Sequence, residues 1–349
     1  MMPGLSGLWS NPGRSFVDTA SYGLPSIETF DKLQGALRQW RDGTGVWEVW
    51  QDATDQARQS FAKIVGVESN SVTVGASASQ LIGMVASSLV KGQVVVVPEL
   101  EFTSNLFPWL VAESNGIRVV PVPLEDLVDR VAEGCDLVAT SAVQSSTGEV
   151  VDLEAIRVAA REVGATTVVD ATQAIGWLPI EAGQFDVVVC SAYKWLCTPR
   201  GVAYMTISDR MRPRLTPTSA GWFAGEVVHD SYYGLPLRLA KDARRFDISP
   251  AWFSWVGAAS ANLDLLSVGI EKIHDHNVAL TAKLAQALDL DSQGSAILSI
   301  KVDESLDTAT LPFQASSRGG GLRVSFHLYN DLDDVDLVFE TLKGKVIID

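Results

Sequence analysis

The sequence predicts an α/β fold with two domains: a large one over residues 15–245, built on a mostly parallel sheet, and a smaller α+β domain over residues 246–349. Short apolar segments such as DVVVC (186–190) alternate with helical segments in the first part. Strands that are apolar on both sides indicate a sheet covered on both faces. Near residue 245 the pattern changes to long helical segments, which sets the predicted boundary.

The large domain is expected to alternate strands and helices in chain order. Strands are expected at residues 71–75, 93–101, 117–123, 135–143, 166–173, 185–193 and 201–207. The segments SASQLIGMVASSLV (77–90) and SNLFPWLVAESNG (104–116) are expected to form helices, the second ending at Gly116. Residues 152–165 have the apolar spacing of an amphipathic helix.

The small domain is expected to contain more helix than the large one. Residues 254–288 predict two long helices divided near Gly269. Two strands at 295–302 and 321–329 and a closing helix at 331–344 are expected to follow. Residues 1–14 are expected to join this domain.

Composition restricts the class of protein. A hydrophobic content of 47% with 20% charged residues is typical of a folded chain, and a net charge of −15 argues against a nucleic-acid partner. No signal peptide and no run of about 20 apolar residues is visible, so we expect a soluble protein without a membrane partner. Cys135, Cys190 and Cys197 lack metal-ligand spacing, which predicts no metal site and a reducing cytoplasm.

Lys194 is the only charged residue between Asp186 and Arg200, and it follows an apolar strand. In parallel sheets, ligands bind at the carboxyl ends of the strands. A partly desolvated lysine there can form a Schiff base with an aldehyde, because burial favours its neutral, nucleophilic form. Taken alone, the commoner role of such a lysine is to extend along apolar surface toward water.

Asp170 ends another apolar strand, in VVVDATQA. A buried carboxylate is costly unless it has a cationic partner, and a protonated ring nitrogen would be such a partner. The charged ring would then accept electrons from a substrate. The alternative is that Asp170 caps the next helix. Gln173 is expected to bond to a ring hydroxyl or to the Schiff-base region.

The turn VGASAS places Ala76 and Ser77 where a strand meets a helix. Backbone amides at a helix start bind phosphate, and the hydroxyls of Ser191 and Tyr193 could reach the same group. Glycine and serine are also ordinary loop residues, so this turn is a weak signal alone.

Two further residues stand after strands. Phe102 is placed to stack on an aromatic ring, although core packing would account for it equally well. Gln144, which directly follows the expected strand at 135–143, is the last of the candidate cofactor-binding residues. Together these residues predict a site for an aromatic, phosphorylated, cationic ring held by a lysine, and pyridoxal 5′-phosphate meets each requirement.

Several segments, in this order, resemble the class V aminotransferases, a group of fold type I pyridoxal-phosphate enzymes that includes cysteine desulfurases, kynureninase and isopenicillin-N epimerase-like proteins. They are GASASQ, ELEFTSNLFPW, VQSSTGEVVDLEAI, VVDATQAIG, SAYKWLCTPRG and GLRVSFHLYNDLDDVD. The resemblance covers residues from about 15 to 340, and VVDATQ with SAYKWLCTPRG is its most specific part.

The resemblance implies a role for each matched position. Lys194 matches the Schiff-base lysine, Asp170 the partner of the ring nitrogen, and Gln173 the residue near the ring hydroxyl. Arg323 matches the arginine that binds the substrate α-carboxylate as a bidentate pair. Ser249 matches a phosphate ligand donated by a neighbouring subunit, which implies a homodimer. The phosphate ligands of the same subunit are matched by Ser77, Ser191 and Tyr193.

The expected function is that of a pyridoxal-phosphate enzyme acting on a small α-amino acid through Lys194 and a Cα carbanion, as an aminotransferase or a lyase. A cysteine desulfurase ranks lower, because the segment before Arg323, LPFQASSRGGGLRV, lacks the cysteine that carries sulfur in that group. A non-catalytic protein with the same fold is a further alternative. A nicotinamide enzyme is disfavoured, since no G-x-G-x-x-G follows an early strand. Whether His229, Tyr232 and Tyr233 line the pocket stays open.

Overall fold

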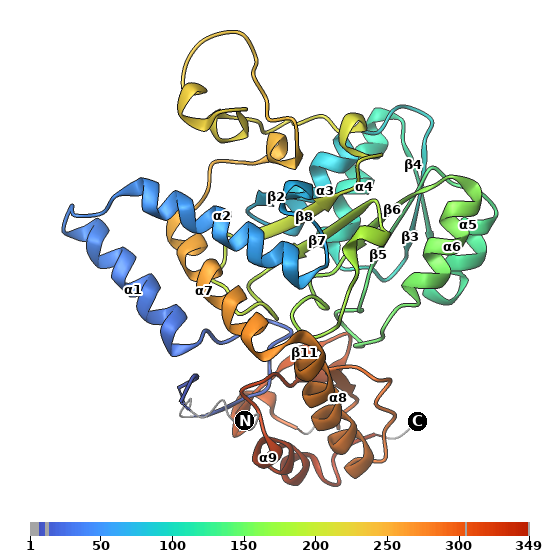
Figure 1. The fold of residues 1–349 in the computed structure, drawn as a ribbon. Helices are drawn as coiled ribbons and strands as arrows, with labels where there is room; N and C mark the ends of the chain where they lie inside the picture. Colours follow the sequence, from blue (N-terminus) through green and yellow to red (C-terminus); the bar gives the residue numbers. More distant parts are fainter. Residues whose placement is uncertain (1–6, 11–13, 304–305, 348–349) are drawn as a thin grey trace.

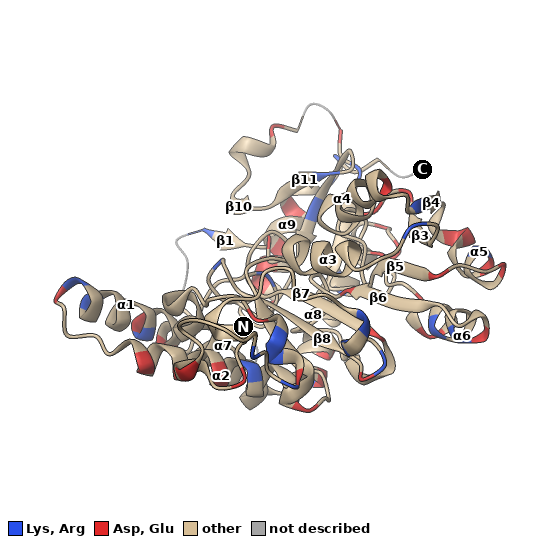
Figure 2. Ribbon diagram, turned by 90° about the horizontal axis from the view of Figure 1, so that it is seen from above, with Lys and Arg blue, Asp and Glu red and all other residues tan. Residues whose placement is uncertain are grey.

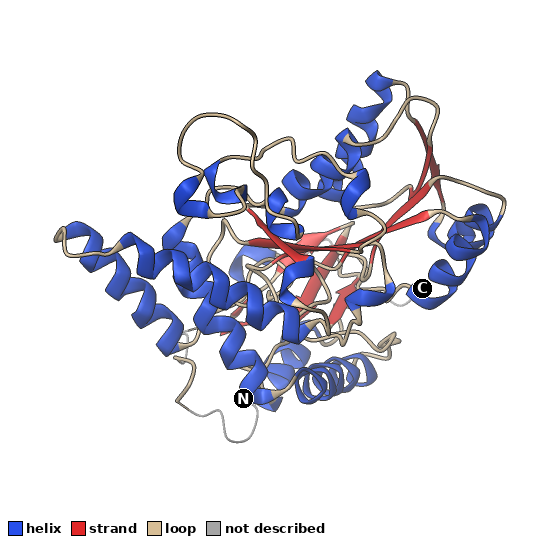
Figure 3. Ribbon diagram, turned by 45° about the horizontal axis from the view of Figure 1, so that its top comes forward, coloured by secondary structure: helices blue, strands red, loops and turns tan. Residues whose placement is uncertain are grey.

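A computed structural model describes residues 7–10, 14–303 and 306–347. A seven-stranded sheet runs through the middle of the molecule and has helices on both of its faces (Figures 1 and 3). In spatial order its strands are β2 (Val72–Gly75), β8 (Ala203–Ile207), β7 (Val187–Ser191), β6 (Thr166–Asp170), β5 (Leu137–Ser141), β3 (Val94–Pro98) and β4 (Arg118–Val122). All neighbouring pairs are parallel except those that β8 makes with β2 and β7. The expected α/β fold with a mostly parallel sheet is confirmed.

The strands are apolar at every position because each face of the sheet is covered by helices. Val95 and Val97 of β3 pack into the core formed with α3 (Ala78–Ser87) and α4 (Thr103–Ala112). Val96, between them, points to the opposite face, where α5 (Leu127–Ala132) and α6 (Leu153–Val163) pack. Side chains in a strand alternate between faces, so a strand buried on both sides reads as a continuous valine run.

Helix α6 shows how local sequence sets an element. Its side chains Ile156, Ala159 and Ala160 are buried against the sheet, and the Asp152 side chain caps its first turn. It ends at Gly164, whose φ of 74° suits glycine. Charged residues of both signs lie on its outer face, as on the other peripheral helices (Figure 2).

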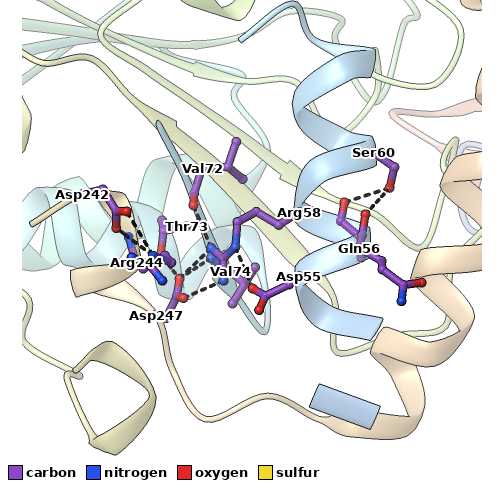
Figure 4. Close-up of polar contacts among 11 residues, drawn as sticks. Asp55, Gln56, Arg58, Ser60, Val72, Thr73, Val74, Asp242, Arg244 and Asp247 are labelled. Carbon is purple, nitrogen blue, oxygen red and sulfur yellow. Dashed lines mark hydrogen bonds and ion pairs between the residues drawn. The ribbon is translucent and has the colours of Figure 1, made fainter. Parts of the chain in front are cut away.

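Two long helices that the sequence analysis did not predict, α1 (Ile27–Arg41) and α2 (Trp47–Ile64), pack with α7 (Trp252–Val268). Arg58 of α2 is buried and bonds to both carboxylate oxygens of Asp247, at 2.7 and 3.2 Å (Figure 4). The Asp247 carboxylate also accepts hydrogen bonds from the Thr73 hydroxyl and the Val74 amide of edge strand β2. One buried ion pair therefore joins α2, the sheet edge and the segment before α7.

Replacing Arg58 by methionine is expected to lower the free energy of unfolding by about 3–5 kcal/mol, because it leaves the Asp247 carboxylate buried without its cation. Burial already raises the pKa of Asp247, and Arg58 opposes that rise. Urea unfolding followed by circular dichroism would measure the loss. Arg157→Met, which removes the surface partner of Glu154, is the matched control and should change little. Equal midpoints for the two variants would contradict the expectation.

The C-terminal part forms a third core. Gly269 separates α7 from α8 (Ile270–Ala287), as expected. Helices α8 and α9 (Leu332–Leu342) pack with a three-stranded sheet whose order is β11 (Ser316–Arg318), β12 (Gly321–Ser325) and β9 (Ile297–Ile300). A two-residue strand β1 (Ser15–Phe16) pairs with β10 (Phe313–Gln314).

The predicted boundary near residue 245 is not tested by these contacts and stays a prediction. The expected placement of residues 1–14 falls largely outside the described residues. No described helix combines the length and apolar character that crossing a membrane requires.

Candidate active site

Six of the predicted site residues meet around one cavity at the carboxyl edge of the sheet. Lys194, which follows β7, is only 6% exposed, and its Nζ lies 5.4 Å from the centre of the Phe102 ring and 5.9 Å from that of Tyr193. The residues that line the cavity are Ala78, Phe102, Ser104, Ser141, Ser145, Asp170, Thr172, Gln173, Ser191, Tyr193 and Lys194. Six of these eleven residues were predicted from the sequence: Phe102, Asp170, Gln173, Ser191, Tyr193 and Lys194. They come from separate segments, which the parallel strands bring together at one edge of the sheet.

The turn that carries Lys194 is held tightly by other parts of the chain. The amide of Gly23 donates to the Tyr193 carbonyl at 2.9 Å, and a Cβ on Gly23 would overlap the Lys194 carbonyl oxygen. On the next residue, the Trp195 indole donates to Gln173 Oε1 at 2.8 Å. The Trp195 carbonyl accepts from the buried His327 ring at 3.0 Å, where burial lowers the His327 pKa to about 3 and keeps it neutral. The lysine backbone is therefore fixed before any ligand binds.

Gly23→Ala is expected to displace this turn, because the added methyl group meets backbone and not a flexible side chain. Overpacking of this kind costs about 1–3 kcal/mol of unfolding free energy, and we expect weaker cofactor binding in parallel. Thermal unfolding and cofactor titration would measure both effects. Gly35→Ala in α1 is the control, since a Cβ there meets nothing within 4 Å and alanine favours a helix. If both variants bound cofactor like the parent chain, the close contact would be unimportant.

Asp170 ends β6, which is the parallel neighbour of β7, so its side chain faces the same cavity as Lys194. Its Oδ1 accepts from the Thr172 amide at 2.9 Å. Burial raises the pKa of Asp170, and the hydrogen bonds with Thr172 and the charge of Lys194 oppose the rise. Burial also lowers the pKa of Lys194 to about 8; the charge of Asp170 opposes this and that of Arg323 adds to it.

The Lys194 amine is therefore expected to react with an amine-selective reagent at lower pH than an ordinary lysine, whose pKa is 10.5. The neutral form is the nucleophile, so in cofactor-free protein the labelling rate should be half-maximal near pH 8. Pulse labelling with peptide mass spectrometry across this range would measure it, with exposed Lys63 as the reference in the same sample. A Lys194 profile that coincides with that of Lys63 would contradict the shift.

The start of α3 reaches the cavity at Ala78. Ser77 is the N-cap of this helix, and its hydroxyl accepts from the Gln80 amide at 3.3 Å. The Ser191 hydroxyl accepts from the Ala78 amide at 2.9 Å, while the Ala76 amide donates to Gln80 Oε1. Backbone amides and hydroxyls at a helix start are an anion site.

Three predicted ligands lie differently, and their roles stay predictions. Gln173 lines the cavity, but its Nε2 already donates to the Ala20 carbonyl and to the Ser145 hydroxyl. Gln144 is buried, and its Nε2 has no hydrogen-bond partner in the described part of the chain; it lines a neighbouring cavity beside Glu99, Glu125 and Glu149. Ser249 is exposed on the surface.

Arg323 lies directly behind the cavity wall, on β12, and is 1% exposed. Its Nη1 donates to the Ser145 carbonyl at 2.6 Å and its Nη2 to the Ser21 hydroxyl at 2.9 Å. Asp18 lies 3.7 Å from Nη2. Burial lowers the pKa of Arg323 to about 10, and neither Nε nor Asp18 Oδ1 has a hydrogen-bond partner among the described residues.

Sequence reasoning missed several residues of the cavity. Ser145 contacts both Arg323 and Gln173, and Thr172 contacts Asp170. Glu101 is buried beside the cavity, where its carboxylate accepts from the amide and hydroxyl of Ser141. Burial raises the pKa of Glu101, and the charge of Asp170 adds to the rise. Glu101, Ser145 and Thr172 follow the observed strands β3, β5 and β6 by two to four positions. Their place at or just after a strand was the only signal in the sequence.

The residues present fit pyridoxal phosphate. The buried Lys194 amine, with its lowered pKa, suits the aldehyde of the cofactor. The buried Asp170 carboxylate, which has no ion pair among the described residues, suits a protonated ring nitrogen. Hydroxyls at the start of α3 suit the phosphate, and Phe102, which is 45% exposed at the cavity, offers a face for the ring.

Comparisons with known proteins agree with this fit. The family model Aminotransferase class-V matches residues 46–315. An uncharacterized aminotransferase, YcbU, of Bacillus subtilis is 27% identical over 324 residues, which cover 86% of each chain. A probable cysteine desulfurase of Methanothermobacter thermautotrophicus is 26% identical, again over 86% of each chain. A solved complex of the cystine C-S lyase C-DES superposes with a TM-score of 0.86 at 18% identity and covers 99% of this chain and 100% of its own.

The structural likeness confirms the expected fold type I architecture. The family match confirms an enzyme that depends on pyridoxal 5′-phosphate and acts on amino acids. The chain belongs to the class V aminotransferase family.

Proposed function

We propose that this chain acts on a small α-amino acid, as an aminotransferase or a lyase, with Lys194 as the covalent anchor of the cofactor. One observation carries the proposal: Asp170 ends β6 and Lys194 follows the adjacent parallel strand β7, and both are buried and line the same cavity. Two opposite charges of this kind are costly to bury unless they serve a ligand.

The side chains divide the chemistry among them. Pyridoxal phosphate supplies an aldehyde that binds amines and a ring that accepts electrons from the substrate Cα. Lys194 would hold the aldehyde, and its free Nζ would take the Cα proton of the substrate. Asp170 keeps the ring nitrogen protonated. Ser77, Ser191 and Tyr193, with the Ala76 and Ala78 amides, bind the phosphate.

Arg323 binds the substrate α-carboxylate. Its guanidinium is buried, and its Nη1 bonds to Ser145 at the cavity wall, so a carboxylate that replaced this contact would meet a desolvated cation. Charge-assisted bonds in such surroundings are stronger than neutral ones. Phe102 lies against the ring, and Gln173 and Gln144 are the remaining proposed contacts of the cofactor.

We further propose that the enzyme is a cytoplasmic homodimer. Exposed apolar side chains on α1 and α2, among them Trp40 (63% exposed) and Val49 (61%), support an interface between copies. Ser249 is exposed beside the end of β2, where Ile248 bonds to Val74, so it is available to a partner's phosphate. The three free cysteines suit a reducing compartment.

A cysteine desulfurase remains the second candidate, because relatives described as probable cysteine desulfurases align over most of the chain. The cysteines of this chain favour a reaction that needs no thiolate. Burial raises the pKa of Cys190 and Cys197 far above the ordinary value and that of half-buried Cys135 as well. A persulfide on this chain would need a reactive thiolate.

The test is to add pyridoxal phosphate to the purified protein and to record its absorbance. Yellow colour should develop at one equivalent, and borohydride reduction followed by peptide mass spectrometry should locate the cofactor on Lys194. Amino acids screened against the loaded protein should then change the spectrum. A protein that stays colourless, or a cofactor found on another lysine, would refute the proposal. Sulfide released from cysteine by a variant lacking all three cysteines would exclude a persulfide on this chain.

A further inference from the structure

We propose that Arg318 makes this site selective for amino acids that carry a second, distal anionic group, such as a side-chain carboxylate or sulfinate. The inference rests on the proposed function in one respect, since it takes Arg323 as the ligand of the α-carboxylate. It adds a residue and a substrate class that the roles described above do not include.

The register of the hairpin places the two arginines on one face of the small sheet. Ser316 of β11 pairs with Arg323 of β12, and Arg318 pairs with Gly321. Residues two apart in a strand share a face, so Arg318 is the diagonal neighbour of Arg323. Such neighbours lie about 7–8 Å apart. Gly321 stands between them on this face, where a Cβ would meet the Ser299 hydroxyl at 2.8 Å and the Ile300 carbonyl oxygen at 3.2 Å.

The tip of the same hairpin reaches the cavity wall. A Cβ on Gly319 would lie 3.3 Å from the Cβ of Ser146, next to Ser145, whose carbonyl and hydroxyl bind Arg323. Arg318 is therefore anchored beside the segment that separates Arg323 from the cavity. Its own side chain is exposed.

The Arg318 guanidinium has no carboxylate partner among the described residues, and its Nη1 donates to the carbonyl of its neighbour Ser317. The charge reaches the site, because it lowers the pKa of both Lys194 and Arg323.

A substrate held at Arg323 by its α-carboxylate would extend its side chain along the cavity wall toward the hairpin tip and Arg318. A distal anion there would gain a charge-assisted bond, whereas the matching amide would not. Because Arg318 is exposed, water and salt weaken the contact. We expect a preference of about tenfold for the acidic ligand at low salt.

The test uses the loaded enzyme and ligands that cannot react. Calorimetry would measure the dissociation constants of succinate and of succinamate, its monoamide, neither of which carries an amine. The parent enzyme should bind succinate about tenfold more tightly, and Arg318→Gln should bring the two constants within about twofold. Arg118→Gln, which removes an exposed arginine on the far edge strand β4, is the matched control and should keep the preference. Added salt should weaken the preference in the parent and not in Arg318→Gln.

Equal affinities in the parent enzyme, or a preference that survives in Arg318→Gln, would overturn the inference. A preference lost equally in Arg118→Gln would also overturn it, because the effect would then follow net charge alone. Failure of the proposed function looks different: cofactor uptake or the spectral response to amino acids would be absent, whatever the two ligands do. Spectral titration with L-aspartate and L-asparagine would then extend the result to substrates.

Discussion

Lys194→Ala is expected to abolish the yellow colour of the loaded protein and to lower turnover about a thousandfold or more, because it removes both the anchor of the aldehyde and the group that takes the Cα proton. The loss should not come from unfolding. The lysine is buried with a pKa lowered to about 8, so its charged form is poorly solvated, and the alanine variant should be at least as stable as the parent. Absorbance, steady-state rates and thermal unfolding measure the three quantities.

Two controls separate the roles of this amine. Lys194→Arg keeps a positive charge near Asp170 but offers no nucleophile, so it should be as inactive and colourless as Lys194→Ala. Lys63→Ala removes an exposed lysine of α2 and should have no effect. A yellow, active Lys194→Ala protein would show that another amine anchors the cofactor and would remove the basis of the proposed function.

Asp170→Asn is expected to lower turnover about a hundredfold or more while leaving the protein as stable or more stable. An amide cannot hold the ring nitrogen protonated. For stability, burial raises the pKa of Asp170 in the folded state, so at neutral pH its charged form opposes folding. This penalty is absent below the ordinary carboxyl pKa and grows as pH rises through the folded value. The asparagine variant should therefore lose that pH dependence.

The same substitution should change the pH dependence of labelling at the neighbouring Lys194. The Asp170 charge opposes the downward shift of the Lys194 pKa, so the variant should label at Lys194 at still lower pH. Asp152→Ala is the reciprocal control: it removes the cap of α6, which should cost about 1 kcal/mol of stability and leave turnover unchanged. Unchanged turnover in Asp170→Asn would indicate that the ring nitrogen has a different partner.

The sequence predicted the parts of this protein that depend on local pattern. Valine runs such as residues 94–97 identify strands because both faces of the sheet are buried, and this pattern also located Lys194 and Asp170 at strand ends. Helix α1 was missed because it buries only Thr29 and Ala36, so its apolar stripe is weak. Arg58 resembles a surface residue in sequence, and only the fold brings Asp247 to it.

Contacts between distant segments could not be predicted. Nothing in the local sequence shows that Ser145 would bond to Arg323, or that the Gln173 amide group would donate hydrogen bonds to Ala20 and Ser145. Gln144 follows a strand as Lys194 does, but the direction of a loop side chain depends on its neighbours, and these turn it toward another cavity.

The contact between Gly23 and the turn at Lys194 has a consequence for how the enzyme matures. Asp18 lies beside Arg323, and the Ser325 amide donates to the Val17 carbonyl. The early segment that contacts the turn at Lys194 is therefore held in place by a segment near the end of the chain. During synthesis the nascent chain cannot form these contacts until residue 325 has left the ribosome. Pairings this distant in sequence form slowly. In an incomplete chain the turn that carries Lys194 would lack these contacts. The ability to bind vitamin B6 should therefore appear only at the last stage of folding.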